Sequence, residues 1–116
     1  MCIRDSARPA TGQWQGEQVI PASAVASISG GGNPAKFAGA GYTTLPGGSY
    51  RSQWWVLHNE NGAYSARGIH GQAIYIDPTA EMVIARFATY PISFNAAIDP
   101  TSLPAYQAVA DYLLTK

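Results

Sequence analysis

In the middle of the chain, apolar residues come in short runs that turn residues separate. Trp54, Trp55 and Val56 give the first run a high β preference. Asn61-Gly62 then signals a hairpin, because Asn-Gly readily takes the positive φ of tight turns. Short strands joined by short turns predict an antiparallel meander. Four strands are expected, at residues 51–58, 63–68, 72–77 and 82–88.

Helical patterns flank this central region. Pro21 suits a first helical position, where its missing N–H costs nothing, and residues 22–28 predict a short helix that the Gly-rich residues 29–34 end. Near the C-terminus, Ser102 can cap a second helix that has Pro104 in its first turn. Its apolar residues recur at three- and four-residue steps and form one stripe: Leu103, Tyr106, Val109, Ala110 and Leu113.

The pattern as a whole indicates the α+β class. We expect an antiparallel sheet of about four strands, with a short N-terminal helix and a C-terminal helix packed on it. Residues 39–50 are rich in Gly, Pro, Thr and Ser and predict a long loop, which is either a functional rim or a plain connector. Residues 90–101 predict an irregular connector.

Composition excludes several functions. The 116 residues suffice for one domain, and a net charge of zero lacks the basic footprint of a nucleic-acid or polybasic membrane binder. No apolar run approaches the roughly 20 residues of a membrane span, and the single Cys2 excludes an internal disulfide. Residues 1–6 lack both the apolar region of a signal peptide and a regular period, so we interpret them as a non-native or broken start.

The most suggestive chemistry lies at residues 67–72, Arg-Gly-Ile-His-Gly-Gln, between two predicted strands. Glycine lets the backbone approach a ligand, so that an amide N–H can point into a site. The alternative is an ordinary connection whose histidine is solvated.

Other kinds of site find no support. His58 and His70 fall on different strands and no cysteine pair exists, so neither a metal site nor a cofactor is expected. The glycine runs do not lie between a strand and a long helix, which argues against a phosphate or dinucleotide loop. Asp77 and Glu81 bracket a turn, where carboxylates are usually solvated. No Ser-x-x-Lys is present.

Three segments carry a resemblance to a known family: residues 14–22, 50–55 and 67–78. Their Tyr-x-Ser-Gln-Trp-Trp and Gly-Ile-His-Gly-Gln motifs resemble the C-terminal part of β-lactamase-related serine hydrolases. The nearest branch is the class C-like amidases and esterases of the 6-aminohexanoate-dimer hydrolase type. The resemblance implies that residues 7–116 are the C-terminal portion of a β-lactamase/transpeptidase-like domain.

In that family a Ser-x-x-Lys serine, assisted by a tyrosine, attacks an amide or ester and forms an acyl-enzyme. The innermost strand contributes a backbone N–H to the oxyanion hole. The resemblance places that strand at residues 63–68 and implies that the N–H of Ile69, presented by Gly68, is the donor. His70 and Arg67 would flank the acyl pocket. Three aromatic residues are expected either to line this pocket or to belong to the core: Tyr50, Trp54 and Trp55.

The chain departs from the family in two ways. β-Lactamases carry Lys-Thr-Gly or Lys-Ser-Gly on this strand, where this chain offers Ala66-Arg67-Gly68 or His70-Gly71-Gln72, and the missing lysine favours an amidase or esterase. The Ser-x-x-Lys and tyrosine motifs, which lie upstream in the family, are absent. We therefore expect a fragment of a serine hydrolase for small amides or esters, inactive alone and prone to self-association through an uncovered apolar face.

Two alternatives remain open at this point. One is a small non-catalytic module, in which the loop at 39–50 and the Trp54-Trp55 pair contact a ligand. The other is a non-catalytic relative of the hydrolases. Members of the family occur in the cytoplasm and in the periplasm, so the sequence leaves the compartment open.

Overall fold

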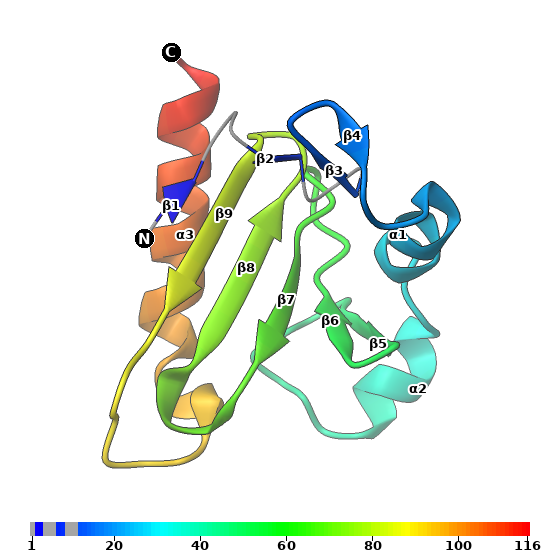
Figure 1. Ribbon diagram of the computed structural model, residues 1–116. Coiled ribbons are helices and arrows are strands. Elements are labelled where there is room, and N and C mark those ends of the chain that lie inside the picture. The colour runs from blue at the N-terminus through cyan, green and yellow to red at the C-terminus, as the bar shows by residue number, and fades with distance from the viewer. Residues whose placement is uncertain (1, 4–6, 9–11) are drawn as a thin grey trace.

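The computed structural model describes residues 2–3, 7–8 and 12–116 of the chain. These residues form an antiparallel sheet of six strands (Figure 1). The strands cross the sheet in the order β1 (Cys2–Ile3), β9 (Met82–Arg86), β8 (Ala73–Asp77), β7 (Tyr64–Arg67), β6 (Trp54–Val56) and β5 (Ser49–Arg51). Strands β5 to β9 are consecutive in the sequence as well as in the sheet, which confirms the predicted antiparallel meander and the α+β class.

One predicted strand is wrong in its bounds. Residues 51–58 are not a single strand but contain a tight hairpin between β5 and β6, in which Arg51 pairs with Trp54. Ser52 and Gln53 make the turn with φ values of 51° and 70°. Positive φ at both central residues is the geometry of a type I′ turn, which usually requires Gly or Asn. Because neither residue is Gly, Asn or Asp, this hairpin could not be predicted from the local sequence.

The N-terminal part of the described chain adds a small second sheet beside the main one. It contains β2 (Ala7–Arg8), β3 (Gln13–Trp14) and β4 (Glu17–Gln18). Gln15 and Gly16, both with positive φ, turn the chain between β3 and β4. Strands β3 and β4 therefore form a short hairpin that leads into the first helix.

The first helix is confirmed and a second one was missed. Helix α1 (Ala22–Ser29) follows Pro21, which is the N-cap residue rather than the first helical residue. Helix α2 (Pro34–Gly39) begins inside the stretch that was predicted only to end α1. The side chain of Asn33 accepts hydrogen bonds from the N–H groups of Ala35 and Lys36, so Asn33 caps this helix and Pro34 starts it.

The C-terminal helix begins earlier than predicted. Helix α3 (Asp99–Leu114) already includes Ser102, which is buried inside the helix instead of capping it. Pro100, rather than Pro104, lies in the first turn. No helix among the described residues is long and apolar enough to cross a membrane.

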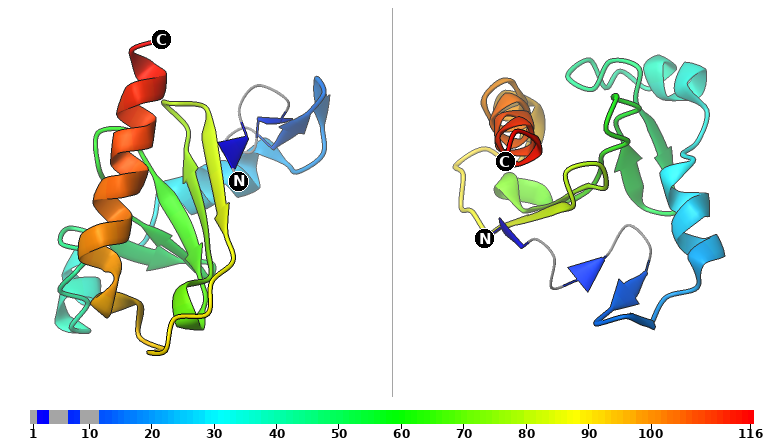
Figure 2. Two further views of the ribbon diagram at one scale, coloured as in Figure 1. Left: turned by 90° about the vertical axis from the view of Figure 1, so that its left-hand side faces the viewer. Right: turned by 90° about the horizontal axis from the view of Figure 1, so that it is seen from above.

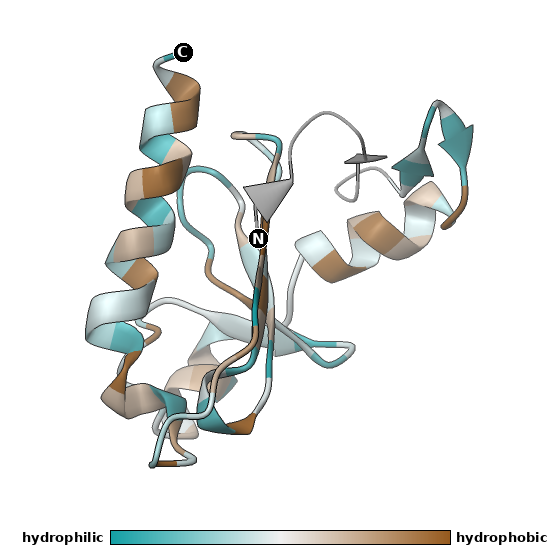
Figure 3. Cartoon of the chain, turned by 60° about the vertical axis from the view of Figure 1, so that its left-hand side comes forward, coloured by the Kyte–Doolittle hydropathy of each residue, from teal (hydrophilic) through white to brown (hydrophobic). Residues whose placement is uncertain are grey.

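The sheet lies between α3 and α1, as the edge-on view in Figure 3 and the two views in Figure 2 show. Side chains alternate between the two faces of each strand, so each face has its own apolar cluster. The cluster under α3 comprises Ala63, Tyr75, Ala80, Met82, Tyr106 and Ala110, with Leu57, Ile84, Leu103 and Leu113 packed against it. The cluster on the α1 face comprises Val56, Tyr64 and Ile76, with Ile28, Trp54 and Val83. The predicted stripe of α3 is confirmed except for Val109, which is exposed.

Candidate active site at the open end of strand β7

Strand β7 loses one of its two neighbours before it ends. On one side β8 pairs with it as far as Arg67, and the N–H of Gly68 extends the ladder by donating to Gln72 O at 2.9 Å. On the other side β6 pairs only with Tyr64 and Ser65. The edge of β7 that faces away from β8 is therefore left without a strand partner beyond Ser65, within the part of the chain that the structure describes.

The amide of Ile69 lies at this open edge. Successive N–H groups along an extended strand point to opposite edges. Because the N–H of Gly68 points to β8, the next N–H, that of Ile69, points away from β8. No acceptor for the Ile69 N–H is found among residues 2–3, 7–8 and 12–116, whereas the N–H of His70 donates to Ser93 O at 3.2 Å. The Ile69 amide is thus available to an external acceptor.

A groove of about 540 Å³ lies beside this edge. That volume is within the usual range of small-molecule sites, roughly 300–1,000 Å³. Its walls come from the loop after α2, the end of β7, Trp55 of β6 and the connector before α3. The lining residues are 40–45, Trp55, 67–69, 93–96 and Asp99. The first half of the predicted loop at 39–50 is therefore a wall of the groove.

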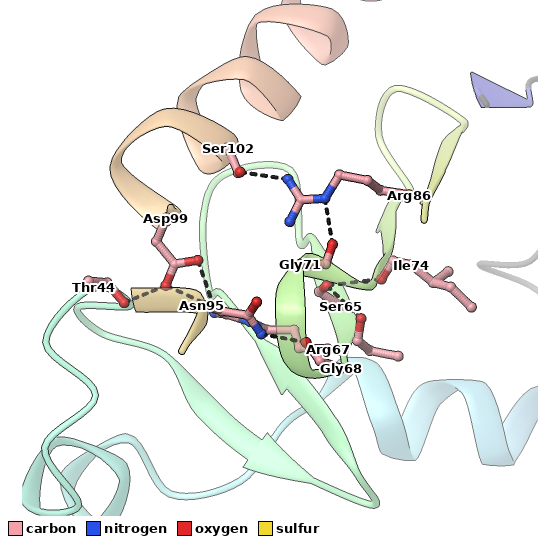
Figure 4. Close-up of polar contacts among 11 residues, drawn as sticks. Thr44, Ser65, Arg67, Gly68, Gly71, Ile74, Arg86, Asn95, Asp99 and Ser102 are labelled. Carbon is pink, nitrogen blue, oxygen red and sulfur yellow. Dashed lines mark hydrogen bonds and ion pairs between the residues drawn. The ribbon is translucent and has the colours of Figure 1, made fainter. Parts of the chain in front are cut away.

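An ion pair between two of the lining residues, Arg67 and Asp99, lies in the wall of the groove, and Figure 4 shows its contacts. Arg67 Nη2 lies 2.6 and 2.8 Å from the two carboxylate oxygens of Asp99, and Thr44 Oγ1 donates to Asp99 Oδ2 at 2.5 Å. Both charged side chains are nearly buried, with exposed fractions of 12% for Arg67 and 6% for Asp99. The contacts join β7, the loop after α2 and the start of α3. The Arg67 charge is thus matched by Asp99, and its binding of substrate stays a prediction.

His70 holds the connector that follows β9. Its backbone is left-handed, with φ 58° and ψ 24°, inside the 3₁₀ turn η1 (Ile69–Gly71). Its ring Nδ1 donates to Tyr90 O at 2.7 Å, because a carbonyl can only accept. Its carbonyl accepts from the Tyr90 N–H at 3.1 Å. His70 is not among the residues that line the groove, and its place beside an acyl pocket stays a prediction.

The two glycines of this turn have different roles. Gly71 has a φ of 91°, and a Cβ there would lie 2.4 Å from the Tyr90 ring, so only glycine fits. Gly68 is extended, with φ −113° and ψ 169°, and its Cβ would approach Gln72 Cβ to 2.9 Å. Glycine was expected here because it lets the backbone approach a ligand closely. The close neighbours of these two glycines are instead side chains of the protein itself, those of Gln72 and Tyr90.

The aromatic residues of the β5–β6 hairpin divide between the two faces of the sheet. Trp55 lines the groove, and Tyr50, its partner across the hairpin, packs edge-on against it with ring centroids 4.7 Å apart. Tyr50 lies beside the groove rather than in its wall. Trp54 points to the opposite face, where its ring lies 5.4 Å from that of Tyr64. Because neighbouring side chains on a strand alternate, Trp54 belongs to the core and Trp55 to the groove.

Arg86 ties the η1 turn to α3. Its Nε donates to Gly71 O at 2.7 Å and its Nη1 donates to Ser102 Oγ at 2.6 Å. The guanidinium also lies over the Tyr106 ring, 5.5 Å from its centroid. Burial raises the pKa of Tyr106, and the Arg86 charge partly opposes this. The η1 turn is thus fixed to the C-terminal helix by charge-assisted hydrogen bonds.

Two residues of the site were missed by sequence reasoning, because both lie in the predicted irregular connector. Asp99 pairs with Arg67, and Asn95 donates through Nδ2 to Gly68 O at 2.8 Å (Figure 4). Pro100 next to Asp99 was the only available signal, since Pro is common in the first turn of a helix. In the ranges that the structure describes, no group of three or more His, Cys, Asp or Glu could hold a metal ion.

Comparison with known proteins gives one consistent relationship. No family model matches the sequence. The 6-aminohexanoate-dimer hydrolase of Paenarthrobacter ureafaciens is 38% identical over 77 residues, which are 66% of this chain and 20% of that protein. A solved structure from Bacillus anthracis, provisionally named a 6-aminohexanoate-dimer hydrolase, matches with a TM-score of 0.70 and 31% identity over 90% of this chain and 26% of that chain.

The chain therefore spans between a fifth and about a quarter of the length of these relatives. Both sequence and fold agree with the resemblance that the Gly-Ile-His-Gly-Gln and Tyr-x-Ser-Gln-Trp-Trp motifs indicated. These findings support the interpretation of the 116 residues as a fragment of a β-lactamase-related hydrolase, similar to a segment of 6-aminohexanoate-dimer hydrolases.

Proposed function

We propose that this chain forms one wall of the active site of a serine hydrolase that cleaves amide or ester bonds through an acyl-enzyme. The observation that carries the proposal is the Ile69 N–H, which points away from β8 at the open edge of β7 and has no acceptor among the described residues. The name of the matched relatives supports a small amide as the substrate class.

The proposed role of Ile69 is electrostatic. Attack on a carbonyl carbon converts the carbonyl oxygen into an oxyanion, and a preorganised N–H stabilises the charge as it develops. One such donor typically contributes about two to three orders of magnitude in rate. Gly68 would present the donor, while Trp55 and the side chain of Ile69 would contact the apolar part of the substrate.

The nucleophile would come from outside these residues, because the sequence holds no Ser-x-x-Lys. One serine within the chain does contact a histidine: Ser49 Oγ lies 2.6 Å from His58 Nε2. This serine is fully buried and also accepts a hydrogen bond from the Gly32 N–H at 2.9 Å. A substrate carbonyl has no access to Ser49. The Ser49–His58 contact joins β5 to the segment after β6, the Gly32 bond joins β5 to the loop after α1, and neither supplies a nucleophile.

A second candidate function is a non-catalytic ligand-binding module. The groove of about 540 Å³ favours it, since the groove is formed by this chain alone and includes Trp55 and the exposed Phe94. A non-catalytic relative of the hydrolases would have the same features. Both differ from the proposed enzyme in lacking an acylated serine.

The experiment is active-site labelling with a fluorophosphonate, followed by mass spectrometry. We expect this chain alone to remain unlabelled and to hydrolyse a p-nitrophenyl ester no faster than buffer. A protein in which the same reading frame joins this chain to a Ser-x-x-Lys segment should be labelled at that serine and should hydrolyse the ester. Acylation of the chain alone would refute the proposal, and a reading frame without Ser-x-x-Lys would favour the binding module.

A further inference from the structure

The hydrogen bond from Asn95 reaches the same peptide unit that carries the proposed oxyanion donor. Asn95 starts the 3₁₀ turn η2 (Asn95–Ala97), and its Nδ2 donates to the carbonyl oxygen of Gly68 at 2.8 Å (Figure 4). That carbonyl and the N–H of Ile69 belong to one planar peptide group, and the described residues contain no cis peptide bond. In a trans peptide the C=O and the N–H point in opposite directions. Holding the Gly68 oxygen therefore aims the Ile69 N–H.

We propose that Asn95 is a positioning residue, which fixes the Gly68–Ile69 peptide so that its N–H faces the groove. The inference rests on the proposed function, because it assigns Asn95 a role in the same oxyanion site. Asn95 would not touch the substrate's reacting atoms. It would act through the Gly68–Ile69 peptide group. Its hydrogen bond would fix the orientation of the peptide plane and would polarise the peptide, so that the Ile69 N–H becomes a stronger donor.

The position of Gly68 explains why such support is needed. The N–H of Gly68 makes the last ladder bond of β7, to Gln72 O. The Gly68–Ile69 peptide that follows is therefore no longer held by β8. Glycine also has the widest conformational freedom of any residue. Without a bond to its carbonyl, the Gly68–Ile69 peptide could rotate and turn the Ile69 N–H out of the groove. A hydrogen bond to the carbonyl also strengthens the N–H of the same peptide as a donor, by about 10–30%.

The orientation of the Asn95 amide follows from its partner. Gly68 O can only accept, so Nδ2 must face it and Oδ1 must face away. Oδ1 is buried without a protein partner among the described residues, as is the hydroxyl of Tyr106. Asn95 and Tyr106 both line a chamber of about 10 Å³ behind the groove, which is about the volume that one water molecule needs. Exchanging the two ends of the amide would place two acceptors against each other at Gly68.

Asn95 is itself held at both sides in the chain. The N–H of Ile98 donates to Asn95 O at 2.9 Å, and the carbonyl of nearby Ser93 accepts from the His70 N–H. The first bond closes the η2 turn and the second joins the segment just before it to the η1 turn, so Asn95 approaches Gly68 from a backbone that is already fixed. Prepositioned support of this kind is what a catalytic donor requires, because a displacement of about 1 Å can cost about 100-fold in rate.

The inference can be tested by NMR on the isotopically labelled 116-residue chain itself. The wild-type chain should show a scalar coupling across the hydrogen bond between Asn95 Nδ2 and the Gly68 carbonyl carbon. The Ile69 amide should have an order parameter near 0.85, the value of rigid backbone. Absence of the coupling together with a mobile Ile69 amide in the wild-type chain would overturn the inference without any variant.

Asn95→Asp supplies the variant test, because it keeps the shape of the side chain but replaces the donor with an acceptor. We expect a changed Ile69 amide shift and an order parameter below about 0.6, with the amides of β8 unchanged. Asn33→Asp is the matched control. It makes the same chemical change at an N-cap whose side chain only accepts, and it should leave Ile69 as in the wild type. An unchanged Ile69 amide in Asn95→Asp would overturn the inference, and Asn95→Ala repeats the test if Asn95→Asp does not fold.

The NMR result separates this inference from the proposed function. If the Ile69 amide depends on Asn95 but Ile69→Pro has no effect on hydrolysis in a protein that contains the nucleophile, then the proposed function fails and the positioning stands. If Ile69→Pro slows hydrolysis but Asn95→Asp leaves the Ile69 amide unchanged, then the inference fails alone. If both hold, Asn95→Asp should lower kcat by about 10- to 100-fold with little change in KM.

Discussion

Replacing Ile69 with proline removes the proposed oxyanion donor and little else. Proline has no N–H, and this N–H has no acceptor among the described residues, so no protein hydrogen bond is lost there. Ile69 is not one of the residues with positive φ. A residue that precedes proline must be extended, and Gly68 already is, with φ −113° and ψ 169°.

The expected change in stability is small. The Ile69 side chain is 68% exposed, so its loss costs at most about 1 kcal/mol of the 1.5–3 kcal/mol that a fully buried isoleucine contributes. Proline restricts the unfolded chain and returns about 0.4–1 kcal/mol. The free energy of unfolding of this chain, measured by urea denaturation, should therefore stay within about 1 kcal/mol of the wild type.

The expected change in rate is large. In a protein that joins this chain to its Ser-x-x-Lys segment, kcat for a small ester or amide should fall about 100- to 1,000-fold, the usual cost of one oxyanion donor. Ile69→Ala keeps the N–H and should change kcat by less than about tenfold. If Ile69→Pro retained kcat within a factor of about three, the Ile69 amide would not be an oxyanion donor.

The neighbouring position supplies the control for stability. His70→Pro breaks the bond to Ser93 O and the ring contact with Tyr90 O. It also demands a φ near −65° where the backbone has 58°. We expect a loss of about 3 kcal/mol or more from the free energy of unfolding. Equal loss in the two proline variants would contradict the geometry described for this turn.

Three further predictions concern the rest of the chain. Arg67→Ala leaves Asp99 buried without its cation and should lower the free energy of unfolding by about 3–5 kcal/mol. The double variant R67M/D99N removes both charges and should lose less, which urea denaturation of the two variants would measure. Burial, followed by the nearby Asp77 carboxylate, raises the pKa of Tyr75 from near 10 to about 12. The unfolded chain then loses this proton first, so stability should fall by up to about 3 kcal/mol between pH 10 and 12, and Tyr75→Phe should lessen the fall. Phe87 and Phe94 are 92% and 76% exposed, so the chain should associate as concentration rises in sedimentation, and replacing both with serine should reduce this.

Much of the sheet could be predicted because its signals are local. β-Branched and aromatic runs with an Asn-Gly turn indicate strands within a few residues of each other. The hairpin at Ser52 and Gln53 escaped because two residues that seldom take positive φ are held there by the pairing of Arg51 with Trp54. Tertiary contacts had overridden the local preference.

The sequence also did not indicate which charged side chains are buried. Asp77 was expected in solvent but is fully buried. Its carboxylate accepts from the Ala80 N–H at 2.9 Å and from Asn61 Nδ2 at 2.8 Å. These bonds compensate for desolvation, so the carboxylate organises the turn between β8 and β9 from inside.

The site was predictable only in part. Ile69, Gly68 and Arg67 entered through the family resemblance, and the groove does adjoin all three. Asn95 and Asp99 could not be found because their partners lie 27 and 32 residues away, and such contacts leave no periodic or motif signal. Alternation along a strand places Trp54 and Trp55 on opposite faces, but which of them faces the groove could not be known until the register of the hairpin was known.

The role of the Ile69 N–H as an oxyanion donor can be tested most directly by a crystal structure. The protein would contain this chain and the nucleophilic serine and would be inhibited with a phosphonate. The phosphonyl oxygen occupies the position of the oxyanion. We expect the Ile69 nitrogen to lie about 2.7–3.1 Å from that oxygen, with Asn95 Nδ2 still bonded to Gly68 O. An Ile69 nitrogen more than about 4 Å from the phosphonyl oxygen, well outside hydrogen-bonding range, would contradict it.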